Sequence, residues 1–200
     1  MQNLAFLKPM LAEAEERTAL VELNKDQLKD AMKTIVTHYE KNRRKKGIII
    51  SLSAPIEQIT EEDDFSMLDK EQLILIDMCS GKKGKATVNG FKTFFIETPS
   101  DLTSLRIILE NLLQKNENEK NEKKFVLFDS ISALSTYVER KVLDKFMYYL
   151  NNKISFEGDT GIFLSIKNPK VDEDIEIIKQ FCSKFYDFSG VVTMEVEKAE

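Results

Sequence analysis

The sequence is poor in the residues on which many catalytic and metal sites depend. It has a single histidine, His38, with no serine or cysteine nucleophile signature near it. Its two cysteines, Cys79 and Cys182, lie far apart and belong to no C-x-x-C or Cys/His cluster. These absences exclude a zinc site of the common spacings and give no support to histidine-assisted nucleophilic catalysis. Isolated cysteines favour a reducing, cytoplasmic setting.

Proline and glycine are also scarce, and no stretch rich in Pro, Gly or Ser divides the 200 residues, which predicts one globular core. The net charge of −5 shows no basic bias, so a nucleic-acid partner is not favoured. The apolar residues near the N-terminus are interrupted by Lys8 and Pro9 and are followed by acidic residues. This pattern is neither that of a signal peptide nor that of a membrane span, and we expect no membrane association.

Residues 1–17 form a unit of their own in this interpretation. Leu4, Leu7 and Leu11 are spaced for one face of a short amphipathic helix, which predicts an N-terminal arm followed by a single domain over residues 18–200. The apolar face can pack on the chain's own core or on a partner, and the first alternative is the ordinary one.

Apolar runs without alternation recur along the domain and indicate strands buried on both faces, as in parallel sheets. Asn89-Gly90 between β-prone flanks predicts a hairpin. Expected strands cover residues 18–23, 47–52, 73–78, 85–95, 125–128, 160–166, a segment around 185, and 191–196. Expected helices cover 25–42, a segment through 64, 99–115, 136–151 and 172–182. Alternating strands and helices predict an α/β fold with a mainly parallel central sheet and helices on both faces.

A further absence concerns phosphate binding. The buried run FVLF, residues 125–128, delivers Asp129 to the carboxyl end of a strand, where ATPases place the acid that holds magnesium. The usual partner is a G-x-x-x-x-G-K-[ST] loop, and no segment fits it. Residues 81–87, GKKGKAT, come nearest, but two residues separate the glycines and Ala86 stands where the hydroxyl belongs. We interpret this segment as a basic turn.

Polar residues end several of the expected strands at the edge where ligands bind in such sheets. They include Ser53, Asp77, Glu97 and Asp129 with Ser130. The carboxylates of Asp77, Glu97 and Asp129 are candidate ligands of a divalent cation if they converge. In the alternative, which we favour, each caps a helix or pairs with a lysine.

Three segments resemble the RecA/KaiC-like ATPases. FVLFDSISAL, residues 125–134, is similar to the family's Walker B strand. GIIISLSAP, residues 47–55, resembles the strand that in KaiC ends in paired glutamates before a proline. FYDFSGVV, residues 185–192, resembles the late Asp-Gly-Val strand, with two residues interposed. The resemblance extends from about residue 20 to 197 and implies a three-layer RecA-like fold.

The departures from the family imply loss of activity. At the phosphate-loop position the chain has LVELNKDQL, residues 20–28, without glycine and with Glu22 and Asp26, which repel phosphate; Ser53 stands at the position of the catalytic glutamates. Asp129 and Ser130 then mark a degenerate Walker B position, and we assign no catalytic residue, no metal ligand and no cofactor.

The resemblance therefore implies an inactivated member, similar to divergent archaeal KaiC-like proteins linked to signal transduction. Such a member is expected to be a non-catalytic regulatory or scaffold module with a protein partner, and a monomer or dimer rather than a hexameric ring. The alternative is a nucleotide-binding protein or weak Mg-dependent ATPase, in which Lys25 or Lys29 replaces the missing lysine. A DNA-associated RecA paralogue is a third candidate, which the acidic balance does not favour.

Overall fold

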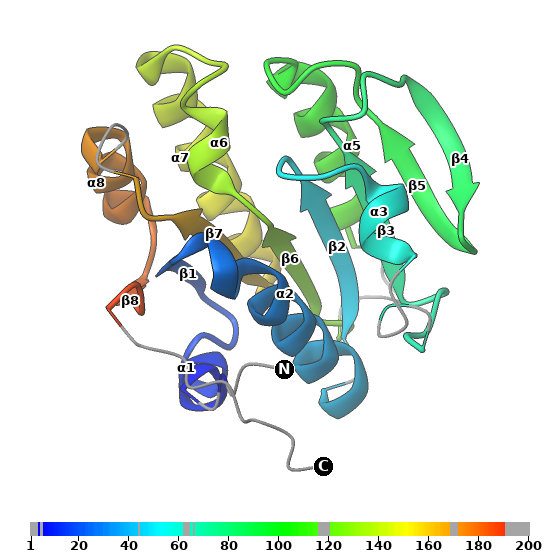
Figure 1. Ribbon diagram of the computed structural model, residues 1–200, viewed down its shortest axis with the longest axis horizontal. Coiled ribbons are helices and arrows are strands. Elements are labelled where there is room, and N and C mark those ends of the chain that lie inside the picture. Colours follow the sequence, from blue (N-terminus) through cyan, green and yellow to red (C-terminus); the bar gives the residue numbers. More distant parts are fainter. Residues whose placement is uncertain are drawn as a thin grey trace, which may run out of the picture.

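The structure, a computed structural model, describes residues 4, 6–43, 45–61, 65, 67–115, 121–168 and 172–190. These residues form an eight-stranded sheet in the order β4-β5-β3-β2-β6-β7-β1-β8 (Figure 1). All neighbouring strands are parallel except the β4–β5 pair. The strands are β1 Thr18–Leu23, β2 Lys46–Ser51, β3 Leu73–Asp77, β4 Gly84–Val88, β5 Phe91–Phe95, β6 Lys124–Phe128, β7 Thr160–Ile166 and β8 Lys184–Asp187.

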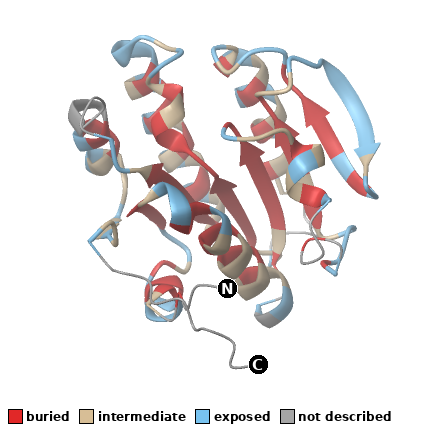
Figure 2. Ribbon diagram, viewed as in Figure 1, coloured by how far each residue is buried: buried red, intermediate tan, exposed pale blue. Residues whose placement is uncertain are grey.

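Helices cover both faces of this sheet, and the inner strands are buried along their length (Figure 2). One core cluster packs α1 (Leu7–Glu13), α2 (Leu28–Thr37) and α3 (Ile56–Thr60) on the first face. The other packs α5 (Leu102–Leu113), α6 (Ile131–Leu134), α7 (Arg140–Glu157) and α8 (Asp172–Phe181) on the second. A 3-10 turn, η1 (Lys25–Gln27), precedes α2, and a π-helical turn, η2 (His38–Asn42), follows it. The predicted three-layer α/β fold with a mainly parallel sheet is confirmed.

The apolar face of α1 is buried within this chain. Leu7, Met10 and Leu11 are inaccessible or nearly so, and they belong to the same core cluster as the buried residues of α2. The Tyr39 hydroxyl donates to the Leu11 carbonyl oxygen at 3.1 Å, which ties α1 to the end of the α2 segment. The arm therefore packs on the domain's own core.

The Asn-Gly hairpin is also confirmed. Asn89 and Gly90 join β4 to β5 with φ angles of 49° and 90°, and this pair of left-handed residues matches the twist of two antiparallel strands. The hairpin lies at one edge of the sheet, beyond β3.

Three helix boundaries differ from the sequence prediction. The helix expected over 99–115 begins at Leu102, because Asp101 is its N-cap and accepts a hydrogen bond from the Ser104 N–H at 2.9 Å. The helix expected over 136–151 is replaced by the short α6 and the longer α7. Helix α3 ends at Thr60, and residues 62–64 and the strand expected at 191–196 lie outside the described residues.

Candidate functional site

Strands β2 and β6 meet at the point where the order of the sheet reverses. β3 follows β2 on one side, whereas β7 follows β6 on the other. In open α/β sheets ligands bind beyond the carboxyl ends of the strands at such a point. Ser51 ends β2 and Asp129 directly follows β6, so the residues beyond these two strands define the candidate site.

The end of β2 and the turn that follows it donate hydrogen bonds to the carboxylate of Asp129. Asp129 is fully buried and accepts from the Leu52 N–H at 2.8 Å, from the Ser53 N–H at 3.1 Å and from the Ser51 hydroxyl at 2.8 Å. The Ser53 hydroxyl donates to the same carboxylate. Four donors from the end of β2 and the turn after it thus surround the carboxylate to which the sequence resemblance assigns a magnesium-binding position.

Burial dominates the electrostatics of this carboxyl group. Removal from water raises the pKa of Asp129, and the hydrogen bonds from Ser53, Leu52 and Ser51 counteract only part of that effect. Ser130 is also buried, with its hydroxyl oxygen 3.4 Å from that of Ser132. This pair, predicted as a degenerate Walker B position, therefore contacts its own fold and offers little surface to a ligand.

The other two predicted strand-end carboxylates, Asp77 and Glu97, differ in their surroundings. Asp77 is buried and accepts three backbone N–H bonds, from Ile56, Cys79 and Ser80, each at 2.9 Å. It caps the start of α3 and the turn after β3. Glu97 has an exposed side chain. Within the described ranges, no three His, Cys, Asp or Glu side chains are grouped to hold a metal ion.

The phosphate-loop position holds a tight turn. Asn24 follows β1 directly and forms a capping box with Gln27, whose side chain accepts from the Asn24 N–H at 2.8 Å. The Asn24 amide donates to the Ser189 carbonyl oxygen at 2.6 Å. The chain's own side chains therefore cap this helix start, where a phosphate loop would present free N–H groups.

The segment that resembles the family's Asp-Gly-Val strand lies beside this turn. Asp187 ends β8 and accepts from the Ser189 N–H at 2.9 Å, while the Lys167 ammonium group lies 3.4 Å from its carboxylate. The interposed Phe188 donates its N–H to the Glu22 carbonyl oxygen at 2.9 Å. The two extra residues thus extend the hydrogen bonding between the end of β8 and β1. Val191 and Val192 of the same motif lie outside the described residues.

A small cavity remains next to the Ser53 turn. Its volume is about 290 Å³, and Lys25, Lys29 and Ser53 lie in its wall together with apolar side chains of α2 and α3. The alternative nucleotide-binding function requires that Lys25 or Lys29 replace the missing lysine, and both line this cavity. The cavity is at the lower limit of small-molecule sites.

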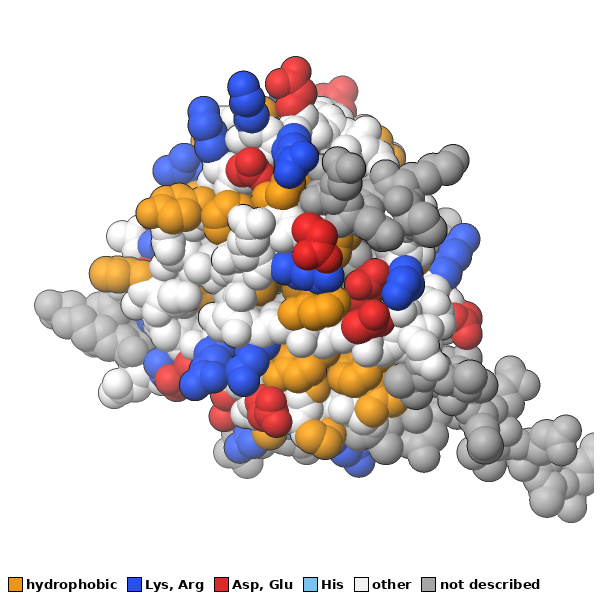
Figure 3. Space-filling view, turned by 90° about the vertical axis from the view of Figure 1, so that its left-hand side faces the viewer, with side chains coloured by type: hydrophobic (Ala, Val, Ile, Leu, Met, Phe, Trp, Pro, Cys, Tyr) orange, Lys and Arg blue, Asp and Glu red, His pale blue; other side chains and the backbone are white. Residues whose placement is uncertain are grey.

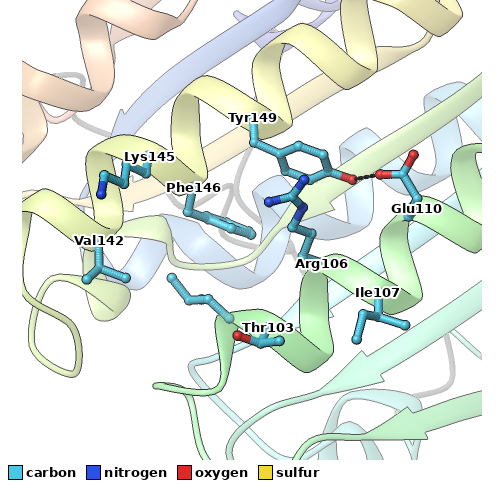
Figure 4. A pocket seen from close by; sticks show the side chains of 9 residues that line it. Thr103, Arg106, Ile107, Glu110, Val142, Lys145, Phe146 and Tyr149 are labelled. Atoms are coloured by element: carbon cyan, nitrogen blue, oxygen red, sulfur yellow. Dashed lines mark hydrogen bonds between the residues drawn. The ribbon is translucent and has the colours of Figure 1, made fainter.

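A larger hollow lies between α5 and α7, on the opposite face of the sheet (Figure 4). Its volume is about 580 Å³. The Arg106 guanidinium stacks over the Tyr149 ring, 4.2 Å from its centroid, and the Tyr149 hydroxyl donates to Glu110. This hollow was not predicted from the sequence. The available signal was the apolar series Val142, Tyr149 and Phe156, spaced by seven residues in a helix.

The side of the molecule that carries α8 and β8 has a surface of mixed composition. Hydrophobic side chains there are interspersed with both signs of charge (Figure 3). No helix among the described residues has the length and apolar composition needed to cross a bilayer.

Comparison with known proteins establishes the fold. The chain matches no protein-family model and no curated protein. Among solved structures, it is similar to a KaiC-like protein from the hyperthermophilic archaeon Pyrococcus horikoshii, with a TM-score of 0.56 and 14% identity, over 86% of this chain and 72% of the other. This similarity shows a RecA/KaiC-like fold, and at such an identity it shows the fold alone.

Proposed function

We propose that this chain is a non-catalytic RecA/KaiC-like domain that acts in the cytoplasm as a regulatory or scaffold protein-interaction module, in signal transduction. The carrying observation is the state of Asp129. Its two carboxylate oxygens receive four hydrogen bonds from Ser51 at the end of β2 and from Leu52 and Ser53 in the turn that follows, two of them from backbone N–H groups. A magnesium ion bound there would have to displace these donors and the turn that supplies them.

Two further features support the proposal. The Asn24–Gln27 capping box closes the helix start at which phosphate binds in P-loop proteins. Ser53, at the position that the resemblance assigns to a catalytic glutamate, donates to Asp129 and has no basic group with which to activate water. On this proposal, contacts internal to the fold take the place of both the phosphate cradle and the base.

Nucleotide binding is the second candidate function, and the cavity beside Ser53 is the observation that favours it. Lys25 and Lys29 lie in its wall, so an anion entering the cavity would meet two ammonium groups. Against it, among the described residues that line the cavity, Lys25 and Lys29 are the only cationic side chains and none is a glycine.

Calorimetric titration of the purified chain with ATP and Mg²⁺ tests the two candidates. The proposal predicts a dissociation constant weaker than about 1 mM, corresponding to less than about 4 kcal/mol of binding free energy, and no hydrolysis above background. Tight binding that requires magnesium and disappears in Asp129→Asn would contradict it. Tight binding that survives Asp129→Asn but disappears in the double variant Lys25→Ala, Lys29→Ala would instead place a nucleotide in the cavity.

A further inference from the structure

Helix α7 carries a line of apolar side chains that its own fold covers only in the middle, where Arg106 stacks over Tyr149. Val142, Tyr149 and Phe156 follow one another at seven-residue intervals and therefore share one side of the helix. Val142 is 44% exposed and Phe156 is 86% exposed, and Ile107 on the neighbouring α5 is 58% exposed. Scattered apolar side chains are ordinary on protein surfaces, but a stripe beside a hollow marks an interaction surface.

The two ends of this surface have complementary shapes. The hollow of about 580 Å³ lies at the end where α5 and α7 begin, and its lining includes Leu102, Ile107, Val142 and Phe146 (Figure 4). Phe156 projects from the last turn of α7, about 21 Å further along the helix at 1.5 Å per residue. One end is concave and apolar, and the other end carries an aromatic side chain without a cover.

We propose that this face binds a second copy of the chain, in a two-fold dimer with the axis close to Tyr149. Tyr149 lies midway between Val142 and Phe156, seven residues from each. A two-fold axis there runs the partner's α7 antiparallel to the first, and brings Phe156 of each chain to the hollow of the other. A closed dimer of this kind needs such a self-complementary patch.

The charges of the face favour the same arrangement. Arg106 and Lys145 line the end at which the two helices begin, and Glu110, half exposed, lies one turn further along α5. Toward the end of α7, Lys153 bridges Glu110 and Glu157 at 3.1 and 3.0 Å, so this end carries an excess of one negative charge. Antiparallel pairing sets the basic end of one chain against the acidic end of the other.

The size of the surface also suits a dimer. At 1.5 Å per residue, the 18 residues of α7 extend about 27 Å and the 12 residues of α5 about 18 Å. At a diameter of about 10 Å, two adjacent helices of these lengths offer a face of about 450 Å² per chain, which is the size of a small, weakly associating interface. A single bound peptide helix would leave much of this face uncovered.

Sedimentation equilibrium of the full chain gives the first test, with a matched pair of variants on α7. Phe156→Lys removes the proposed contact, whereas Tyr148→Lys changes a side chain that is 62% exposed but lies against Phe181 of α8. We expect a dimer for the wild type and for Tyr148→Lys, and a dissociation constant raised about thirtyfold or more in Phe156→Lys. A monomeric wild type, or equal effects of the two substitutions, would overturn the proposal.

Charge reversal gives a second test that does not depend on one variant folding well. Arg106→Glu and Glu110→Arg, each alone, place like charges opposite one another in a two-fold dimer and should weaken self-association. Mixing the two single variants should restore a heterodimer, because each then offers the charge that the other requires. Both variants must first show the cooperative unfolding of the wild type. Folded variants that weaken association alone and do not recover on mixing would contradict the arrangement.

This inference rests on the proposed function and deepens it by naming a partner, yet the two fail separately. A monomeric chain that does not bind ATP would overturn the proposed dimer and leave the proposed non-catalytic function in place. A dimer that binds ATP with Mg²⁺ tightly would overturn the module's non-catalytic character and leave the interface in place.

Discussion

The hydroxyl oxygen of Ser51, at the end of β2, lies 2.8 Å from Oδ2 of Asp129, which follows β6. The parallel register pairs Ile50 with Phe128, so the next residues along the two strands come together without any rearrangement. The strand pairing itself thus delivers the turn after β2 to the buried acid. This relationship makes Asp129 a part of the scaffold, with consequences that stability measurements can check.

Asp129→Asn should leave the chain folded but less stable. The Leu52 N–H donates to one carboxylate oxygen and the Ser53 N–H to the other, so either orientation of an amide leaves one backbone N–H facing an NH₂ group. We expect urea denaturation at pH 7 to show a loss of about 1–3 kcal/mol. Glu97→Gln is the control, because Glu97 is exposed, and it should change stability by less than about 0.5 kcal/mol. An unchanged stability of Asp129→Asn would show that the four donors contribute nothing.

The difference in stability between the wild type and Asp129→Asn should also depend on pH. Burial raises the pKa of Asp129 in the folded chain above its ordinary value of 3.8, so between these two values the folded state binds more protons than the unfolded state. The contribution of this group to stability is therefore greatest at acid pH and falls as the pH rises through the window above 3.8. We expect the difference in unfolding free energy between wild type and Asp129→Asn to be larger at pH 4 than at pH 7. A difference that grows with pH would reverse the assigned direction of the shift.

Much of the fold was accessible from the sequence because buried strands and turn residues carry strong local signals. The bounds of β1 and β7 coincide with the predicted segments, and Asn89-Gly90 marked the hairpin. The start of α5 was misplaced because Thr98, Pro99 and Asp101 all suit a helix start, and only the bond from Ser104 selects Asp101. The contacts of Asp129 could not be predicted, since they depend on which strand lies next to β6. The α5–α7 face was missed because its residues come from two helices that are 27 or more residues apart in the sequence.

Asp77, predicted as a candidate metal ligand, should contribute strongly to the stability of the fold. Asp77→Ala leaves three N–H groups, of Ile56, Cys79 and Ser80, without their acceptor. We expect a loss of about 3 kcal/mol or more in chemical denaturation. EDTA should leave the melting temperature of the wild type unchanged. A fall in melting temperature on chelation, absent in Asp77→Asn, would show that the carboxylate binds a cation after all.

Gly47 at the centre of the sheet predicts an overpacking effect. A Cβ atom at this position would lie 2.4 Å from Cζ of Phe125 and 2.6 Å from Cδ2 of Leu73, both of which are buried. The Phe125 ring cannot move away freely, because it stacks on Tyr39 with 5.2 Å between the ring centroids. Gly47→Ala should therefore cost about 1–3 kcal/mol of unfolding free energy. Gly190→Ala, where no atom lies within 4 Å of the added carbon, should have little effect.

The N-terminal arm gives the last prediction, which concerns assembly as well as stability. An apolar arm can bind a neighbouring chain, but Leu11 is inaccessible, belongs to the core cluster of α2, and its carbonyl oxygen accepts from Tyr39. Leu11→Ala should accordingly lower the unfolding free energy by about 2–5 kcal/mol through the cavity that it creates. Lys8→Ala, on the exposed side of the same helix, should change it by less than about 0.5 kcal/mol.

Neither substitution should alter the sedimentation mass of the folded protein, because the proposed dimer surface lies on α5 and α7, across the sheet from the core cluster that contains α1. Deleting residues 1–17 should likewise destabilise the chain by removing core side chains. If Leu11→Ala instead changed the mass while the unfolding free energy stayed the same, the arm would have to dock between chains, and the interface would lie on the α1 side.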